Sequence, residues 1–176
     1  MQIGAMISWR TSWSADKICI MHPITVREAR MADLDSLERF QQGVVSAERP
    51  YDPTLKDGTV CYYDIAHMLS REDVLFLVAE SEARVVGCGF AQIEEAEPFF
   101  KHQVQAYFGL MYVEPAYRGR GVNAEIIRSL KRWCRSRNVS ETRLDVYEGN
   151  TVAVKAYEKA GFSKLSIEMR MPLRDE

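Results

Sequence analysis

A short glycine- and arginine-rich stretch, between an apolar run and a helical pattern, constrains this chain more than any other feature. Residues 106–113 are mostly aromatic or aliphatic, which is typical of a buried strand. Pro115 ends that strand, because proline has no N–H to donate to a sheet ladder. Apolar residues then recur at helical spacing from Val122 to Cys134. The intervening residues 117–121 therefore lie where a loop becomes the N-terminus of a helix.

That position predicts an anion-binding site. The first turn of a helix leaves about four backbone N–H groups without partners, and the helix dipole adds roughly half a positive charge there. Gly119 and Gly121 let an anion approach the backbone, and Arg118 and Arg120 add charged, forked donors. A phosphate or pyrophosphate is the expected guest. The alternative is a helix start that needs glycines only for its turn, with both arginines solvated.

The periodicities along the rest of the chain predict an α/β fold of the α+β kind, with a mixed, mostly antiparallel sheet and helices on both faces. We expect strands at 24–29, 74–80, 84–93, 106–113, 142–147 and 165–171, and helices at 33–48, 62–70, 121–137 and 151–160. Few residues separate the second strand from the third, so these two should form an antiparallel hairpin. A helix precedes the fifth strand, which should therefore run parallel to the fourth. Asp33 is a good N-cap for the first helix, and Gly161 is a left-handed stop for the last.

The length and charge of the chain restrict its class. No internal repeat or linker divides the 176 residues, which predicts one domain over 23–176. Residues 1–22 show no sustained period and are expected to be a peripheral extension. A net charge of −2 argues against a general binder of nucleic acid or of anionic membranes. Any basic patch is then local, which suits a small anionic cofactor.

The cysteines and histidines are scattered along the sequence. The four cysteines include no Cys-x-x-Cys pair, which predicts buried thiols in a reducing compartment. The three histidines are equally dispersed, so no metal site is expected. No apolar run reaches the ~18–20 residues that cross a membrane, and charged residues interrupt the first 22 too often for a signal peptide. The cytoplasmic compartment is the expected location.

Two short motifs, and the distance between them in the sequence, are informative about this chain. The first, in the loop, reads Arg118-Gly119-Arg120-Gly121-Val122-Asn123. The second, in the last predicted helix, reads Asn150-x-x-Ala153-x-x-x-Tyr157-x-x-x-Gly161-Phe162. With the element order, they make residues 23–173 resemble the GNAT superfamily of acetyl-CoA-dependent N-acetyltransferases, whose pyrophosphate loop reads Arg/Gln-x-x-Gly-x-Gly/Ala. Asn123 departs from that pattern, because a small residue is usual at its position.

The resemblance implies an acyltransferase that moves an acetyl group from acetyl-CoA to a primary amine of a small molecule or peptide by direct attack. It implies that the fourth and fifth strands splay apart, and that the pantetheine arm pairs with the backbone of Met111 and Val113. The N–H groups that would bind the pyrophosphate, supported by the two arginine side chains, belong to Gly119, Arg120, Gly121, Val122 and Asn123. Asn150 matches a pantetheine contact. Tyr157 matches the general acid that protonates the CoA thiolate.

The acceptor side of this reaction is less defined by the sequence. An amine of the lysine type has a pKa near 10.4, so the reaction needs a base or a water chain leading to one. The family has no universal base position, and the candidates in this chain are Glu94, Glu95, His102 and Glu148. The expected acceptor pocket has aromatic walls from Tyr51, Tyr62, Tyr63, Phe99 and Phe100, although these five could equally be packing residues.

Other interpretations of these motifs stay open. Tyr157 could be a packing aromatic, and Asn150 a helix N-cap. The spacing Gly119-x-Gly121-x-x-Ala124 also fits a dinucleotide fingerprint, although that fingerprint follows a first parallel strand, whereas antiparallel hairpins precede it here. A GNAT-like domain that binds acyl-CoA without catalysis, as a sensor or interaction module, is the other alternative. Neither nucleic acid nor a membrane is expected as a partner, and the resemblance leaves a homodimer open.

Overall fold

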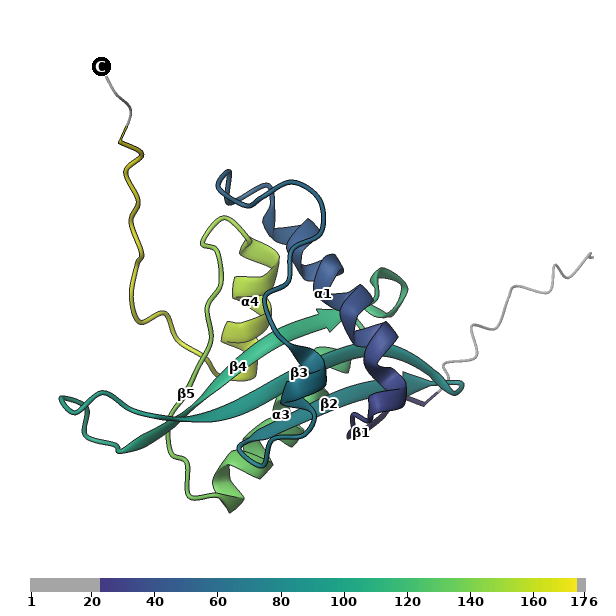
Figure 1. Cartoon of the computed structure of the whole chain (residues 1–176). Helices are drawn as coiled ribbons and strands as arrows, with labels where there is room; N and C mark the ends of the chain where they lie inside the picture. Colours follow the sequence, from purple (N-terminus) through teal and green to yellow (C-terminus); the bar gives the residue numbers. More distant parts are fainter. Residues whose placement is uncertain (1–22, 174–176) are drawn as a thin grey trace, which may run out of the picture.

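The computed structural model describes residues 23–173, so the expected extension 1–22 lies outside the described residues. One sheet with the strand order β1-β2-β3-β4-β5 forms the middle of the molecule (Figure 1). Its strands are β1 (Thr25–Glu28), β2 (Val74–Ser81), β3 (Arg84–Glu95), β4 (Val104–Val113) and β5 (Thr142–Arg143). The helices are α1 (Leu34–Glu48), α2 (Ile65–Met68), α3 (Val122–Ser136) and α4 (Thr151–Ala160), with 3-10 turns η1 (Met31–Asp33) and η2 (Pro115–Tyr117). The mixed, mostly antiparallel sheet predicted from the sequence is confirmed.

The connection between β4 and β5 determines where a ligand could meet the sheet. Strands β1 to β4 pair antiparallel in chain order, and β5 returns through α3 to run parallel to β4, as predicted. The parallel ladder contains only two pairs, Ala106 with Thr142 and Tyr107 with Arg143. β4 continues to Val113, so most of its length has no strand pairing on the β5 side within residues 23–173.

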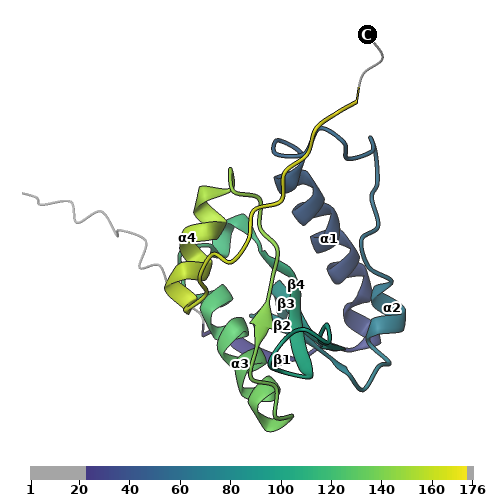
Figure 2. The ribbon, with the colours of Figure 1, turned by 90° about the vertical axis from the view of Figure 1, so that its left-hand side faces the viewer.

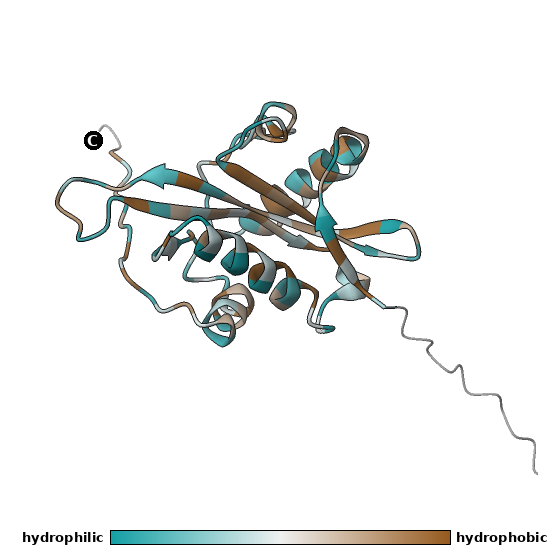
Figure 3. Ribbon diagram, turned by 90° about the horizontal axis from the view of Figure 1, so that it is seen from below, coloured by the Kyte–Doolittle hydropathy of each residue, from teal (hydrophilic) through white to brown (hydrophobic). Residues whose placement is uncertain are grey.

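Helices cover both faces of the sheet, as predicted (Figure 2). The face under α3 buries Ile126, Ile127 and Leu130 against the strands, and the aromatic ring of Phe108 completes this core. On the other face, α1 and α2 bury Leu37, Phe40 and Ile65 against Phe90 and its neighbours. Full burial of one such side chain contributes about 1.5–3 kcal/mol. The middle of the sheet is accordingly hydrophobic, whereas the helices turn hydrophilic sides outward (Figure 3).

The predicted final strand at 165–171 is wrong. Beyond Phe162 the chain leaves the body as an extended segment that pairs with no strand of residues 23–173 (the yellow trace in Figure 1). Leu165, Ile167 and Met169 are 73%, 77% and 89% exposed. The predicted fifth strand, 142–147, also shrinks to Thr142–Arg143. An alternating pattern predicts which side chains lie on each side of a strand, but a strand also needs a neighbouring strand to pair with. Because β5 contains only two residues, it provides very few backbone groups for such pairing.

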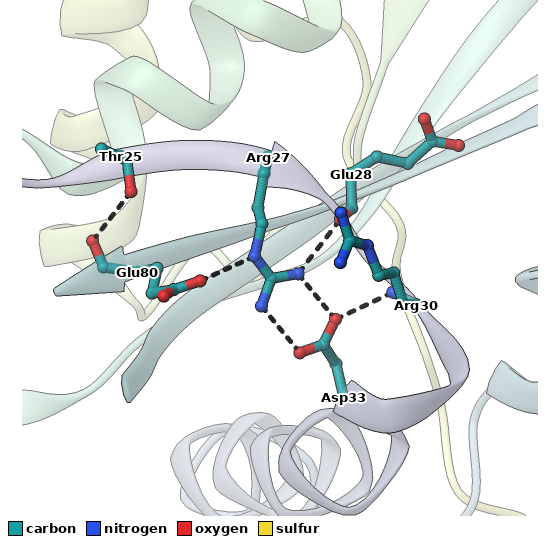
Figure 4. Close-up of polar contacts among 6 residues, drawn as sticks. All are labelled: Thr25, Arg27, Glu28, Arg30, Asp33 and Glu80. Carbon is teal, nitrogen blue, oxygen red and sulfur yellow. Dashed lines mark hydrogen bonds and ion pairs between the residues drawn. The ribbon is translucent and has the colours of Figure 1, made fainter. Parts of the chain in front are cut away.

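Asp33 occupies the predicted N-cap position of α1, but its carboxylate has other partners (Figure 4). Both carboxylate oxygens accept hydrogen bonds from Arg27, at 2.8 and 2.9 Å, and one also accepts from the backbone N–H of Arg30 at 2.8 Å. Arg27 Nε donates in turn to Glu80 at 2.6 Å. The Asp33 side chain is 9% exposed. It therefore ties the start of α1 to β1 and β2, where the sequence indicated only a local cap.

Replacing Asp33 with asparagine should destabilise the fold by about 2 kcal/mol at pH 7, because an amide cannot replace a charged, bidentate acceptor. The Arg27 guanidinium, and to a lesser degree the Arg30 N–H, hold the pKa of Asp33 below its usual value in the folded state. That stabilisation is complete above the ordinary aspartate pKa of ~3.9 and is lost as the pH falls through the lower folded value. Urea unfolding at pH 7 and at descending acidic pH should show the wild type and the variant converging. Asp35→Asn, at an exposed position of the same helix, is the control, and a difference that persists in strong acid would contradict this account.

The turn between β2 and β3 carries backbone strain that a substitution can relieve. Glu82 and Ala83 both have positive φ, +51° and +60°, which is a left-handed geometry that suits glycine at a two-residue hairpin. Ala83→Gly should raise the free energy of unfolding by about 0.5–1 kcal/mol, because glycine adopts this conformation without a Cβ clash. The same change in mid-helix, Ala156→Gly in α4, should lower it by about 1 kcal/mol. Chemical unfolding of both variants tests the pair, and equal signs would contradict the prediction.

Candidate active site

The loop before α3 has the geometry of an anion site. Gly119 and Gly121 have φ of +73° and +80°, and a Cβ at either position would meet nothing within 4 Å. Left-handed residues alternating with others in this way turn successive N–H groups toward one side, which is a recurrent anion-binding arrangement. Gly121 is the N-cap of α3, and the first bond of the helix ladder runs from Glu125 N to Gly121 O at 3.0 Å. The N–H groups of Val122 and Asn123 precede that ladder and point out of the helix start.

The two arginines of the loop are held by aromatic rings. The Arg118 guanidinium lies 5.8 Å from the centre of the Tyr112 ring, and its Nε donates to the Val113 carbonyl at 3.0 Å. The Arg120 guanidinium lies 5.3 Å from the centre of the Tyr117 ring. Both arginines are exposed, so most of their N–H donors stay accessible to a ligand.

Asn123 is the departure from the family pattern and also carries a polar atom without a partner. Its Oδ1 is buried and accepts no hydrogen bond from any residue in 23–173. An orphaned acceptor of this kind costs about 1–3 kcal/mol. Asn123 therefore sits at the helix start at some cost to stability, which a small residue at this position would avoid.

The edge of β4 that β5 leaves uncovered carries two predicted site residues. Glu114 N donates to Val86 O at 2.9 Å, and the Tyr112 carbonyl faces Gly87, so both groups point toward β3. Because successive residues of a strand alternate, the backbone groups of Met111 and Val113 point to the other edge. This is the splayed arrangement that the resemblance implies.

A bulge interrupts β4 at Leu110 and Met111, beside the part of the strand that β5 leaves uncovered. Phe90 pairs with Gly109 and Cys88 pairs with Tyr112, so Leu110 and Met111 together oppose a single residue of β3. Leu110 has a φ of +47°, which costs a non-glycine residue about 1–2 kcal/mol. Bulges and strained residues of this kind turn backbone groups out of the sheet and cluster at functional sites.

Tyr157, from α4, packs on the same core as Met111 of β4. Its ring packs on the core beneath α3 and lies 6.0 Å from the Phe162 ring in an edge-to-face contact. Burial raises the pKa of Tyr157 to about 12, and the Glu48 carboxylate and Tyr63 contribute to that rise. The phenol is therefore protonated at neutral pH. Asn150 caps α4, since its side chain accepts from Ala153 N at 3.2 Å, and the N-cap interpretation of this residue is confirmed.

A cluster of tyrosines and carboxylates lies on the α1 side of this edge. Tyr62 donates to Glu48 Oε2 at 2.9 Å, and Tyr147 donates to Asp52 Oδ2 at 3.0 Å. The Tyr51 ring stacks on Tyr147 with 6.1 Å between the ring centres. Three of the five aromatic residues predicted to line an acceptor pocket, Tyr51, Tyr62 and Tyr63, belong to this region.

Two further members of this region come from the strands. The Tyr107 hydroxyl interacts with the Tyr63 hydroxyl and the Asp145 carboxylate, at the point where β4 and β5 separate. A Cβ on Gly109 would overlap the Phe90 ring and lie 3.0 Å from the Tyr63 hydroxyl, so this position requires glycine. Sequence reasoning missed Glu48, Tyr107 and Asp145, and the only signal for them was the density of tyrosines in 51–63.

The predicted base candidates lie elsewhere or are solvated. Glu94 accepts from Gln105 Nε2 at 2.7 Å, and His102 Nε2 lies 3.2 Å from Gln105 Oε1, at the opposite end of β4 from the glycine loop. Glu95 and Glu148 are exposed. The predicted aromatic residues Phe99 and Phe100 also belong to the β3–β4 loop, beside a hollow of about 320 Å³ that is remote from the glycine loop.

Two functional classes have no counterpart among the described residues. No helix between residues 23 and 173 is long and apolar enough to cross a membrane. In the same range, no three His, Cys, Asp or Glu side chains are grouped so that they could hold a metal ion.

Comparisons with known proteins agree with this geometry. Residues 36–162 match the sequence profile of the acetyltransferase (GNAT) family. An N-alpha-acetyltransferase of Sulfurisphaera tokodaii is 24% identical over 150 residues, which cover 81% of this chain and 81% of that protein. A GCN5-related N-acetyltransferase from Ralstonia eutropha superposes with a TM-score of 0.71 at 18% identity, covering 86% of this chain and 99% of the other. A protein from Clostridium acetobutylicum, predicted to be an acetyltransferase and crystallised with acetyl-CoA, superposes with a TM-score of 0.63 at 19% identity, covering 85% and 96%. Since the profile spans most of the sequence and the solved structures share its fold, the chain belongs to the GNAT family of acetyltransferases.

Proposed function

We propose that this acetyltransferase moves an acetyl group from acetyl-CoA to the primary amine of a peptide or small molecule by direct attack, with Tyr157 protonating the departing thiolate. Three features at or near the edge of β4 that β5 leaves uncovered support the proposal. These are the left-handed glycines before α3, the bulge at Leu110, and a buried phenol that stays protonated at neutral pH.

In this proposal acetyl-CoA lies along the edge of β4. The N–H groups from Gly119 to Asn123 bind the pyrophosphate, and Arg118 and Arg120 add charge from their aromatic supports. The outward backbone groups of Met111 and Val113 pair with the pantetheine arm, as an added strand would. The side-chain oxygen of Asn150 accepts the capping hydrogen bond of α4, so its side-chain NH2 group is the part that would donate to pantetheine.

The chemistry needs one proton removed from the acceptor and one supplied to sulfur. The neutral amine attacks the thioester carbonyl carbon, the carbon–sulfur bond breaks, and the Tyr157 hydroxyl donates its proton to the sulfur. A phenol with a pKa of about 12 cannot ionise unaided near pH 7, so Tyr157 is available as an acid throughout the physiological range. Backbone N–H groups turned out at the β4 bulge suit stabilisation of the carbonyl oxygen as it gains charge.

We favour a peptide N-terminus as the acceptor within this class. The Sulfurisphaera tokodaii relative is named an N-alpha-acetyltransferase. The tyrosine cluster offers hydroxyls that can hydrogen-bond a peptide backbone and rings that can pack on its first side chains. Phe99 and Phe100, at the other end of β4, are too remote from the glycine loop to wall the same pocket.

An acetyl-CoA turnover assay tests the function. Release of free CoA thiol would be followed with acetyl-CoA and separate panels of peptides with free N-termini, N-terminally blocked lysine peptides, polyamines, aminoglycosides and amino acids. Release that depends on one acceptor class supports the proposal and identifies that class. Tight CoA binding without release for any class would favour the acyl-CoA-binding sensor instead, and absence of CoA binding would overturn both.

A further inference from the structure

We propose that Glu48, at the C-terminal end of α1, accepts the proton from the acceptor ammonium, and that its natural acceptor is an α-amine. This inference deepens the proposed function and rests on it. The sequence-based base candidates do not include Glu48, and the following contacts assign it this part.

Glu48 is held at a fixed place by the chain that returns over α1. Gln41 Oε1 accepts from the backbone N–H groups of Tyr62 and Tyr63, at 3.0 and 2.8 Å. Gln42 accepts from Val60 N at 3.2 Å and donates to Val60 O at 2.8 Å. These bonds anchor the segment 60–63 along the helix, so the Tyr62 hydroxyl reaches Glu48 Oε2 at 2.9 Å. The Glu48 side chain is therefore held in one position at the end of α1.

Among residues 23–173, no cation pairs with the carboxylate of Glu48. The neighbouring Arg49 turns away and donates to the carbonyls of Lys56 and Gly58, at 2.7 and 2.5 Å. Within residues 23–173, Glu48 forms no ion pair. Its hydrogen bond from Tyr62 engages one oxygen, and the other oxygen stays available to a donor. A half-buried carboxylate in this condition attracts an ammonium group.

Glu48 and Tyr157 belong to elements on opposite faces of the sheet but are near enough to interact electrostatically. Tyr157 packs on the core beneath α3, whereas Tyr63 and Tyr107 pack on the core beneath α1. The Glu48 carboxylate and Tyr63 nevertheless interact electrostatically with Tyr157. The β4–β5 ladder ends at the pair Tyr107–Arg143, so no strand pairing continues beyond it on this side of β4 within residues 23–173. An amine bound at Glu48 therefore lies near the group that protonates sulfur.

A carboxylate base suits an α-amine better than a lysine. An α-ammonium has a pKa of about 8, whereas a lysine ammonium has one near 10.4, so proton transfer to the same carboxylate is easier by more than two pKa units. Burial raises the pKa of Glu48, the hydrogen bond from Tyr62 opposes this rise, and the charge of Asp52 adds to it. The net rise brings the pKa of Glu48 closer to that of the α-ammonium group. The titratable groups that face Glu48 from the packed elements are Tyr62, Tyr63, Asp52, Tyr147 and Tyr157.

The protons balance in this scheme. Glu48 takes one proton from the ammonium, and the neutral nitrogen forms its bond to the carbonyl carbon. The second proton leaves nitrogen as the amide forms and restores the one that Tyr157 gives to sulfur. Glu48 then releases its proton to water, so the net products are the amide, free CoA and one proton.

The test compares Glu48→Gln with wild type over pH 6–10, using saturating acetyl-CoA and a short peptide with a free N-terminus. Glutamine keeps an acceptor for Tyr62 but cannot take a proton. We expect the variant's kcat/KM to fall about 10²–10³-fold at pH 7. Its rate should then rise about tenfold per pH unit toward the amine pKa near 8, because only amine that is already neutral can react, and the difference should narrow above pH 9.

Two further variants separate a base from a structural residue. Glu38→Gln, an exposed glutamate on the same helix, should match wild type at every pH. Tyr62→Phe removes a hydrogen bond that lowers the pKa of Glu48, so the acidic limb that Glu48 sets should move to higher pH. In Glu48→Gln, only the limb set by the pKa of the amine should remain. A uniform loss in Glu48→Gln at all pH values, or a Tyr62→Phe profile identical to wild type, would overturn the role of Glu48. Wild-type protein without turnover of any amine would overturn the proposed function, and this inference with it.

Discussion

Replacing Tyr157 with phenylalanine should lower kcat by about 10²–10³-fold while the KM for acetyl-CoA changes less than about threefold. The ring would keep its edge-to-face contact with Phe162, so the packing of α4 is preserved. The loss falls on kcat because the hydroxyl acts only as the thiolate departs. A buried phenol with a pKa of about 12 loses its proton only as the pH rises toward that value, so the defect should be constant from pH 6 to pH 10. Steady-state thiol release over that range measures both parts of the prediction.

Tyr117→Phe is the matched control for this substitution. It also removes one tyrosine hydroxyl and leaves the ring on which Arg120 rests. If Tyr157→Phe retains wild-type kcat, Tyr157 is a packing residue and the proton comes from elsewhere. A donor thioester with a less basic thiolate should rescue much of the rate in the variant, because such a leaving group needs less protonation.

Substituting alanine for Gly119 and Gly121 together should weaken CoA binding by about 100-fold. Each position has a positive φ, which costs an alanine about 1–2 kcal/mol, or roughly tenfold in affinity if the free loop relaxes and has to be strained again on binding. The added methyl groups also project into the open space from which an anion would approach the N–H groups. Isothermal titration with CoA measures the change. Binding of pantetheine, which has no pyrophosphate, should stay the same.

Gly58→Ala supplies the control for backbone strain. Gly58 has a φ of +76° and, like the two loop glycines, has nothing within 4 Å of its Cβ position. The substitution imposes the same conformational penalty in the segment that follows α1, away from the helix start of α3. An equal loss of CoA affinity in Gly58→Ala would show that general destabilisation, and not the anion site, causes the effect.

The parts of this molecule that local chemistry determines were predictable from the sequence. Thr151–Ala160 was predicted to the residue, because Asn150 caps its start and Gly161, with a φ of +100°, ends it. The start of α3 followed from the glycine loop in the same way. The position of Asp33 at the N-cap was predicted correctly, but its main partner, Arg27 of β1, was not. A sequence alone does not show which arginine lies beside a helix N-cap in the folded protein.

The acceptor side could not be predicted because distant segments build it. Glu48 ends a helix, and in the sequence it resembles any solvated glutamate. Its environment differs from that of a solvated glutamate because Gln41 and Gln42 bind the segment 60–63, some twenty residues later in the chain. That segment brings the Tyr62 hydroxyl to Glu48. The last predicted strand failed for a related reason, since alternation at 165–171 does not reveal whether an edge is within reach.

That extended C-terminal segment has a consequence for how the protein behaves in solution. Its apolar side chains alternate with Lys164, Ser166, Glu168 and Arg170, and its backbone pairs with no strand in the described part of the chain. An exposed extended segment with one apolar side can pair with other chains, and charges on its opposite side commonly limit such pairing. We therefore expect the three charged residues, Lys164, Glu168 and Arg170, to oppose aggregation of this segment. Neutralising them would leave a segment prone to aggregation, however well the folded body is packed.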